Sequence, residues 1–165
     1  MARIYVSIGS NIERQHNIRS GTRMLADRFG PLILSTVYDS APVGFCGDNF
    51  YNLVAGFDTQ GTPESVITTL HGIEKAHGRA RTGERFGPRT LDLDLLLYDN
   101  LVRHDAAVDL PRREILEHAF VLAPLAEIAP DGVHPETGQT FAELLKRLGP
   151  AGGEPRAVNF EFRQP

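Results

Sequence analysis

Runs of apolar residues predict four β-strands in the first hundred residues. Residues 3–8, RIYVSI, alternate between polar and apolar side chains and are rich in branched residues, which is typical of a half-buried strand. The segments LILSTVYDSAPV, YNLVAGFDT and LDLDLLLY follow as the second, third and fourth predicted strands. The tail GGEPRAVNFEF adds a late edge strand to this expectation.

Apolar residues at helical spacing predict one helix after the first strand and another after the third. The first is expected from about Asn17 to Phe29, with Ser10 or Asn11 as its cap, because short polar side chains bind the free N–H groups at a helix start. The second has Thr62 as its N-cap, proline at its first position, and an end near residue 78.

Two further helical segments follow the fourth strand. A polar, hairpin-like stretch leads to PRREILEHAF, which predicts a short helix, and TFAELLKRL predicts another with Thr140 and Glu143 as a capping box. The element order β-α-β-β-α-β with extra C-terminal elements is typical of a ferredoxin-like α+β sandwich, a mainly antiparallel sheet with helices packed on it. Residues 1–165 are expected to form a single domain, because no internal repeat or low-complexity tract divides them.

Composition and charge argue against several classes of function. The chain has 41% hydrophobic and 23% charged residues, and no run approaches the roughly 18 apolar residues of a membrane span. A net charge of −4 argues against a general nucleic-acid binder. The N-terminus lacks a signal-peptide layout, and a single cysteine, Cys46, suits a reducing compartment. We therefore expect a cytoplasmic monomer without nucleic-acid or membrane partners.

Two aspartates interrupt the fourth predicted strand. Because side chains two apart in a strand point to the same face, Asp92 and Asp94 project together, while Leu91, Leu93 and Leu95 face the other side. Neighbouring carboxylates repel each other and are costly to desolvate, so something cationic must compensate for them.

A cluster of arginines precedes the aspartates. Four of them fall within eleven residues, between glycines: Arg79, Arg81, Arg85 and Arg89. One interpretation is a solvent-facing carboxylate pair, salt-bridged to Arg85 or Arg89. The other is that the carboxylates hold a divalent metal against substrate phosphates, which the arginines grip. The glycines favour the second, a phosphoryl-transfer site whose arginine loop is open without ligands and closes over them.

The sequence lacks the motifs of a P-loop enzyme and of a zinc site. No Walker A sequence is present, and the six scattered histidines and one cysteine give no zinc-ligand spacing. The IGSN segment at 8–11 resembles a phosphate-binding turn, but an ordinary turn from strand to helix is the preferred interpretation.

The segment RFGPRTLDLDLLLYD resembles the hallmark of the 6-hydroxymethyl-7,8-dihydropterin pyrophosphokinase family. The resemblance runs from about residue 4 to residue 148, with the family's order of YVSIGSN, SAPVGFCGDNFYNLVAGF, IEKAHGRAR and FVLAPLAEIAP. It implies a ferredoxin-like α+β fold. It also implies transfer of pyrophosphate from ATP to the hydroxymethyl group of the pterin, with release of AMP, in folate biosynthesis.

The resemblance also assigns residues to this reaction. Asp92 and Asp94 match the aspartates that hold two Mg²⁺ ions, and Arg79 and Arg89 match arginines that engage the phosphates. Phe86 stands where relatives usually have tryptophan, on a loop that closes over the nucleotide. The full set implied for ATP is Glu74, Arg79, Arg81, Phe86, Arg89, Leu95, Arg112, Arg113 and His118. The pterin is implied to contact the backbone of Ser40 and Val43, the side-chain amide of Asn52, and two aromatic walls, Phe50 and Phe120.

The chain departs from the family pattern after Pro111. Relatives commonly have a phosphate-contacting histidine in a PHP or PHY sequence there, whereas this chain has Arg112 and Arg113. Six residues after that histidine position, an arginine that is usual in the family is replaced by His118. The positive charge is therefore relocated within one short segment, which makes a specialised paralogue an alternative.

Three functions compete on these observations. The leading hypothesis is an active Mg²⁺-dependent diphosphotransferase that uses ATP and the reduced pterin. A catalytically weak paralogue that binds nucleotide or pterin as a sensor is the second, and release of AMP distinguishes the two. A nucleic-acid binder on the same fold is disfavoured by the acidic net charge.

Overall fold

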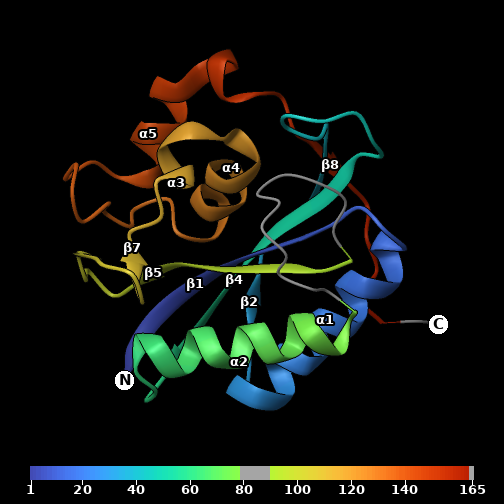
Figure 1. Cartoon of the computed structure of the whole chain (residues 1–165). Helices are drawn as coiled ribbons and strands as arrows, with labels where there is room; N and C mark the ends of the chain where they lie inside the picture. Colours follow the sequence, from blue (N-terminus) through green and yellow to red (C-terminus); the bar gives the residue numbers. More distant parts are fainter. Residues whose placement is uncertain (79–89, 164–165) are drawn as a thin grey trace.

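The computed structural model of the protein describes residues 1–78 and 90–163 and is built around a six-stranded sheet (Figure 1). The strands are β1 (Ala2–Ser10), β2 (Ile33–Leu34), β3 (Val37–Ser40), β4 (Phe50–Thr59), β5 (Asp92–Tyr98) and β8 (Arg156–Val158). They lie in the order β5-β1-β4-β3-β8, with β2 beside β4, and neighbours run antiparallel. This is the strand order of a ferredoxin-like sandwich, so the predicted fold class and the late edge strand are confirmed.

The second predicted strand is divided into two short strands. Both β2 and β3 pair with β4, and Ser35 lies between them. The N–H of Ser35 donates to the carbonyl of Val54 (3.0 Å), and the Ser35 hydroxyl accepts from the N–H of Val54 (2.9 Å). A side-chain oxygen thus replaces a main-chain acceptor at this point, because the chain bends away from the regular strand pattern.

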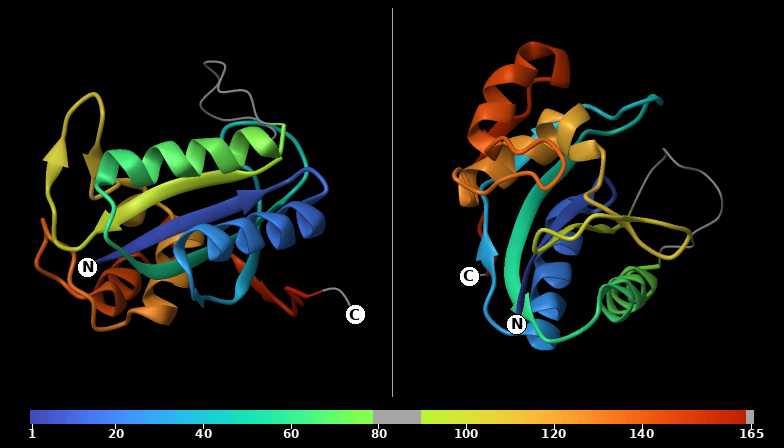
Figure 2. Two further views of the ribbon diagram at one scale, coloured as in Figure 1. Left: turned by 90° about the horizontal axis from the view of Figure 1, so that it is seen from below. Right: turned by 90° about the vertical axis from the view of Figure 1, so that its left-hand side faces the viewer.

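Two helices cover one face of the sheet and enclose the first of two hydrophobic cores (Figures 1 and 2). These are α1 (Arg14–Phe29) and α2 (Pro63–Ala76), which contribute Ile18, Leu25, Leu70 and Ile73 to the core among others. Thr62 caps α2 as predicted, since its side chain accepts from the N–H of Ser65. The longest helix, α1, has 16 residues, and the helices in the described ranges are too short or too polar to cross a membrane.

The start of α1 differs from the prediction. The helix begins at Arg14 rather than Asn17, after Glu13 in the left-handed conformation (φ 42°), and no side chain caps it. Ser10 and Asn11 were therefore the wrong capping candidates. The Asn17 amide instead donates to the carbonyl of Ile12 (2.6 Å), which holds the turn before the helix.

The C-terminal helices cover part of the opposite face and enclose a second core (Figure 2). The helices on this side are α3 (Glu114–Glu117), α4 (Ala119–Ile128), α5 (Phe141–Leu148) and the short 3-10 helix η1 (Gly149–Gly152). The hairpin of β6 (Arg103–His104) and β7 (Asp109–Leu110) precedes them, and its Leu110 packs in the first core. The helix expected in PRREILEHAF is broken at His118, whose extended backbone separates α3 from α4. Thr140 caps α5 as predicted, because its hydroxyl accepts from the N–H of Glu143.

A β-bulge in β5 connects the two cores. Tyr5 and Val6 are adjacent in β1, but they pair with Leu97 and Leu95, so Leu96 is an extra residue. Leu95 packs in the first core, whereas Leu96 and Leu97 both pack in the second. The bulge therefore lets two consecutive leucines face α4, which a regular strand cannot do.

Candidate active site

Three neighbouring strands bring a row of polar side chains to the face that carries α4. Asp92 of β5 pairs with Gly9 of β1, and Gly9 pairs with Asn52 of β4. Residues directly opposite in antiparallel strands share a face, so Asp92 and Asn52 lie on either side of Gly9, about 10 Å apart at a spacing of about 4.8 Å per strand. Helix α4 packs on β4 at Val54, whereas Asn52 is only half-buried beyond it.

The aspartate pair has the predicted orientation. Asp92 and Asp94 are half-buried and lie opposite Gly9 and Ser7 of β1. Leu91, Leu93 and Leu95 are 0%, 1% and 5% exposed on the other face. The alternation expected from the sequence is confirmed. Leu95 packs among core residues of α1 and α2, which leaves only its main-chain groups for a contact with ATP.

Glu74 of α2 supports the strand between the two aspartates. Its side chain is almost completely buried, at 1% exposure, and its Oε2 accepts a 2.9 Å hydrogen bond from the N–H of Leu93. Because β5 is at the edge of the sheet, that N–H has no neighbouring strand as a partner. Glu74, which the resemblance placed on the nucleotide side, thus holds β5 in position.

Arg112 is held next to the aspartate pair by the bulge. Its main-chain N–H donates to the carbonyl of Leu96 (3.0 Å), and its guanidinium donates to both carboxylate oxygens of Glu114 (3.2 and 3.0 Å). Burial lowers the pKa of Arg112, but the negative charges of Asp94 and Glu114 outweigh it and leave the pKa raised. Arg112 therefore stays charged within the field of Asp94.

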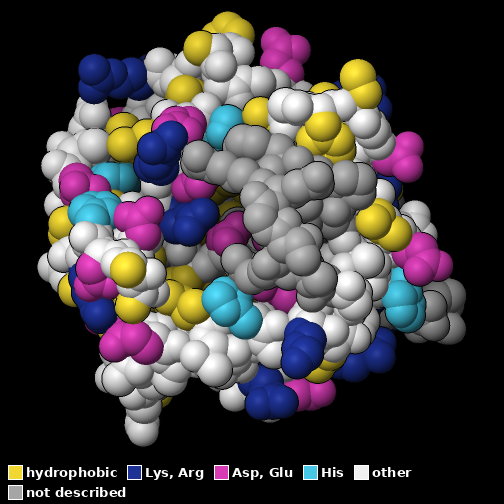
Figure 3. All heavy atoms as spheres, viewed as in Figure 1, with side chains coloured by type: hydrophobic (Ala, Val, Ile, Leu, Met, Phe, Trp, Pro, Cys, Tyr) yellow, Lys and Arg dark blue, Asp and Glu magenta, His cyan; other side chains and the backbone are white. Residues whose placement is uncertain are grey.

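Arg113 is placed differently from Arg112. Its side chain is 65% exposed, and its Nε lies 3.2 Å from Glu117 in the same helical turn. Figure 3 shows that basic and acidic side chains gather close together near the centre of this face of the molecule. Such exposed pairs contribute little to stability, so Arg113 remains able to exchange Glu117 for another anion.

Ser40, Asn52 and Phe50 meet at the end of β3 and the start of β4. The Asn52 amide donates to the Ser40 hydroxyl at 2.5 Å. A Cβ on Gly9 would lie 2.8 Å from Asn52 Oδ1 and 3.7 Å from the Phe50 ring, so only glycine leaves room for the amide in its present position. Val43 is 36% exposed in the preceding loop, and the Phe45 ring packs edge-on against Phe50.

The loop before β4 is anchored by residues that sequence reasoning missed. The Asn11 amide donates to the carbonyl of Asp48 (3.1 Å), and Arg14 donates to the carbonyl of Asn49 (3.1 Å). Ser10 Oγ lies 2.6 Å from the carbonyl of Thr90, just before β5. The IGSN segment leads from β1 to α1, as predicted, and its polar side chains also bind the main chain at Asp48 and Thr90.

Phe120 and His118 form a stacked ring pair at the start of α4. Their ring centroids are 4.8 Å apart and their planes are inclined by 17°. Phe120 is partly buried against the second core, and the His118 side chain is 22% exposed, with Nε2 3.8 Å from Glu117 Oε2. Phe120, the predicted second wall of the pterin site, is therefore in contact with His118, at the position where the resemblance predicts an arginine.

Several predicted residues lie outside the described ranges. These are Arg79, Arg81, Arg85, Phe86 and Arg89, together with the loop that was expected to close over ATP. The structure therefore describes the carboxylate part of the predicted phosphate site and Arg112, but not the arginine cluster.

The donor set at Asp92 and Asp94 fits Mg²⁺. Carboxylate oxygens suit this hard cation, which usually takes one or two carboxylates and completes its shell with water and phosphate oxygens. Within residues 1–78 and 90–163, no group of three or more His, Cys, Asp or Glu side chains is arranged to hold a metal by itself. The two aspartates are therefore suited to a cation that arrives with a phosphate ligand rather than to a closed protein site.

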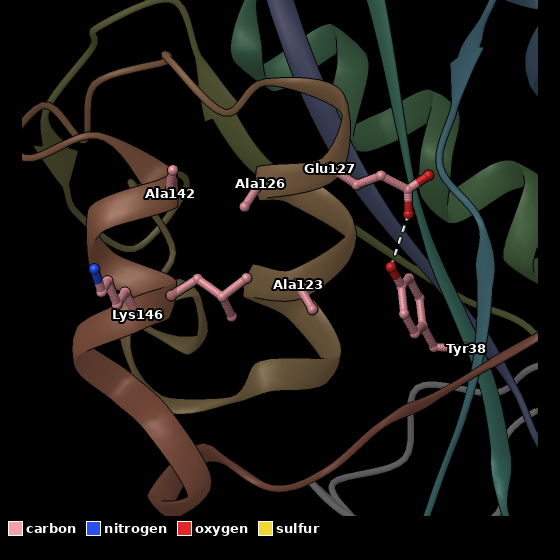
Figure 4. A pocket seen from close by; sticks show the side chains of 7 residues that line it. Tyr38, Ala123, Ala126, Glu127, Ala142 and Lys146 are labelled. Carbon is pink, nitrogen blue, oxygen red and sulfur yellow. Dashed lines mark hydrogen bonds between the residues drawn. The ribbon is translucent and has the colours of Figure 1, made fainter.

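A groove of about 420 Å³ lies between β3, α4 and α5 (Figure 4), and one of its lining residues, Tyr38, pairs with Asn52 across β3 and β4. Tyr38 points across it to Glu127, whose Oε1 accepts from the Tyr38 hydroxyl at 2.8 Å. Burial, and then the Glu127 carboxylate, raise the pKa of Tyr38 to about 12. Glu127 also accepts hydrogen bonds from the N–H and the hydroxyl of Thr36. Its carboxylate oxygens therefore hold α4 against the segment around β3.

Comparison with known proteins identifies related chains. Residues 5–130 match the family described as 7,8-dihydro-6-hydroxymethylpterin-pyrophosphokinase (HPPK). A 2-amino-4-hydroxy-6-hydroxymethyldihydropteridine pyrophosphokinase of Methylorubrum extorquens is 39% identical, over 93% of this chain and 98% of the relative. A protein of the same name from Haemophilus influenzae is 34% identical, over 90% of this chain and 94% of the relative.

Solved structures share the fold at low identity. A Plasmodium falciparum HPPK-DHPS A437G structure with SDX-DHP superposes with a TM-score of 0.70 at 12% identity, and covers 88% of this chain. An HPPK-DHPS in complex with substrates gives a TM-score of 0.71 at 11% identity, again over 88% of this chain. The present chain spans less than half of those two proteins, 42% and 44% of their length.

Proposed function

Because the chain belongs to the 7,8-dihydro-6-hydroxymethylpterin-pyrophosphokinase family, it is a pyrophosphokinase of folate biosynthesis, and we propose that its reaction takes place on the open part of the α4 face of the sheet. The reaction transfers pyrophosphate from ATP to the hydroxymethyl group of 6-hydroxymethyl-7,8-dihydropterin and releases AMP. The phosphates lie at β5 in this proposal, and the pterin lies at β4.

Asp92 and Asp94 are the proposed ligands of two Mg²⁺ ions that arrive with ATP. Bound there, Mg²⁺ supplies positive charge to the phosphate oxygens and the acceptor oxygen. The chain's own part is to hold the two carboxylates on one face of β5, and the hydrogen bond from Leu93 to Glu74 fixes the strand between them. Arg112 adds a permanent positive charge next to Asp94.

The proposed pterin site is built around the Asn52 amide. One N–H of Asn52 donates to Ser40, so the other N–H and Oδ1 form the edge that reads the donor and acceptor pattern of the pterin. Phe50 and Phe120 are the proposed walls on the two sides of the flat ring. Main-chain groups of Ser40 and Val43 complete the contacts in this proposal.

The observation that carries the proposal is the register of three strands. It places Asp92 and Asn52 on one face with only Gly9 between them. A separation of about 10 Å leaves room for the pterin at Asn52 while its hydroxymethyl group reaches the phosphates at Asp92. Catalysis by proximity requires such a fixed distance between the two substrates.

Release of AMP tests the proposal. The protein is mixed with ATP and Mg²⁺, with and without 6-hydroxymethyl-7,8-dihydropterin, and a pterin without the hydroxymethyl group serves as control. AMP should form only with the complete pterin, and chelation of Mg²⁺ should stop it. Binding of both ligands without AMP would instead identify the sensor alternative.

We further propose a cytoplasmic monomer, since one copy contains all the assigned residues and a single cysteine suits a reducing compartment.

A further inference from the structure

The His118 side chain does not make the contacts of a helix cap. It is the N-cap of α4, where a short polar side chain usually binds a free N–H, but its side chain makes no capping hydrogen bond. Its carbonyl accepts from the N–H groups of Val121 and Leu122, at 3.1 and 3.0 Å, so the backbone alone starts the helix. The imidazole is therefore not required for the start of α4.

The imidazole stacks on the ring of Phe120. The two rings are nearly parallel, at 17°, with 4.8 Å between centroids. The carboxylate of Glu117 is 3.8 Å away, which is longer than a hydrogen bond. Phe120 in turn packs against the second core. Core contacts and the imidazole together restrict the rotation of the Phe120 ring.

We propose that His118 is a positioning residue of the pterin site, which acts by stacking on Phe120 rather than by binding ATP phosphates. This inference rests on the proposed role of Phe120 as a pterin wall. An aromatic ring that is already fixed loses less conformational freedom on pterin binding than a freely rotating ring does. The affinity for the pterin is therefore higher than it would be without the stacked imidazole. His118 thus acts on the pterin side of the reaction in this proposal.

A set of four variants tests the proposal. They are His118→Ala, His118→Phe, Phe120→Ala and the double variant His118→Ala with Phe120→Ala, with His16→Ala in the exposed part of α1 as the control. KM for the pterin, KM for ATP and kcat are measured for each, and thermal unfolding verifies that each variant is folded.

His118→Ala should raise KM for the pterin about two- to tenfold, the range expected when one ring pair is lost, and leave KM for ATP and kcat within about twofold. His118→Phe retains a flat ring and should restore the wild-type KM. The double variant should be no worse than Phe120→Ala, because His118 acts only through that ring. The His16→Ala control should match the wild type.

Three results would overturn the proposal: an increase in KM for ATP alone, failure of His118→Phe to restore the pterin KM, or fully additive effects in the double variant. An unchanged pterin KM in Phe120→Ala would remove the wall assignment and the positioning role together. Failure of the proposed function itself is distinguishable, since the wild type would then release no AMP.

Discussion

The main-chain N–H of Arg112 donates a 3.0 Å hydrogen bond to the carbonyl of Leu96, the extra residue of the bulge in β5. The bulge lies two residues after Asp94 in the strand. It therefore fixes the segment after β7 to β5 and keeps the Arg112 guanidinium close enough to Asp94 to raise the pKa of Arg112 despite burial.

Arg112→Ala should weaken ATP binding by about 1.5–3 kcal/mol, the usual contribution of a hydrogen bond to a charged group. A guanidinium stays protonated between about pH 6 and 8, whereas a histidine would lose its charge there. The contribution of Arg112 to the ATP Kd of the wild type should therefore not change over this pH range. Titration calorimetry at several pH values measures both effects. Arg23→Ala, in the exposed part of α1, is the matched control. A Kd within about twofold of the wild type would mean that Arg112 serves only its pair with Glu114.

Asp94→Ala should lower kcat by more than about a hundredfold and leave Tm within about 2 °C. The carboxylate is half-buried beside another aspartate, so its loss removes a proposed metal ligand and also a repulsion. Turnover with Mg²⁺ and thermal unfolding are measured on the same sample. Asp131→Ala, at an exposed position, should be silent in both assays. Near-normal turnover of Asp94→Ala would reject the metal assignment.

Gly9→Ala should raise KM for the pterin about tenfold or more while KM for ATP changes little. The new Cβ would lie 2.8 Å from Asn52 Oδ1, so the amide would have to move from its position next to Ser40. Gly72→Ala is a good control, because its Cβ would meet nothing within 4 Å on α2. That control should gain about 0.5–1 kcal/mol of stability and keep both KM values. Equal pterin KM values for Gly9→Ala and the wild type would contradict the role of Asn52.

Glu74→Ala should lower the free energy of unfolding by about 1–3 kcal/mol, because it leaves the N–H of Leu93 without its acceptor. Glu74→Gln retains a side-chain acceptor and should lose less. Urea denaturation of the two variants measures the difference. A Glu74→Ala protein as stable as the wild type would show that β5 does not depend on this hydrogen bond.

His104 should make stability depend on pH. A hydrogen bond with Asp109, and a further one with Glu136, raise the pKa of His104 above its ordinary value of about 6.5. The charged form is favoured by folding, so this stability is present below about pH 6.5 and is lost as pH rises through the higher folded pKa. Tm is measured from about pH 5 to 8.5. On the alkaline side, the Tm of His104→Asn should fall less steeply with pH than the Tm of the wild type.

His134 should contribute to the pH dependence with the opposite sign. It is 1% exposed, and burial lowers its pKa, so the folded protein favours the neutral ring. Its contribution is present above about pH 6.5 and is lost as pH falls through the lower folded pKa. In the His104→Asn variant, the remaining loss of Tm should therefore occur at acidic pH. A Tm profile identical to that of the wild type would contradict the assignment to His104.

The fold and the aspartate face were predictable because they depend on regular periods. A period of two in LDLDL determines which side chains share a face, and the order of strands and helices restricts the topology to few alternatives. The bulge was not predictable, because LLLY is apolar at every position and gives no sign of which leucine is extra. The contact of Arg112 with β5 depends on that bulge, so it could not be predicted from the sequence either.

Glu74 shows a signal that could have been used. It lies four residues after Leu70 and eight after Val66, which places it on the buried stripe of α2 rather than on the solvated face. A glutamate on a buried stripe requires a hydrogen-bond partner, and β5 is the next strand in the chain. The division of the second strand at Ser35 had no such signal, because a serine is compatible with both a strand and a bend.

The position of β5 at the end of the sheet has a consequence for solubility. An apolar edge strand such as the LLLY part of β5 is in general a template that a second molecule can use to extend the sheet, which is how many proteins begin to aggregate. The extra residue at Leu96 disrupts the regular spacing that such pairing needs, and Glu74 already occupies the N–H of Leu93. Two negative charges on the same strand would repel an identical strand of another copy. Replacement of the aspartates by apolar residues would therefore promote self-association, apart from any effect on the proposed metal site.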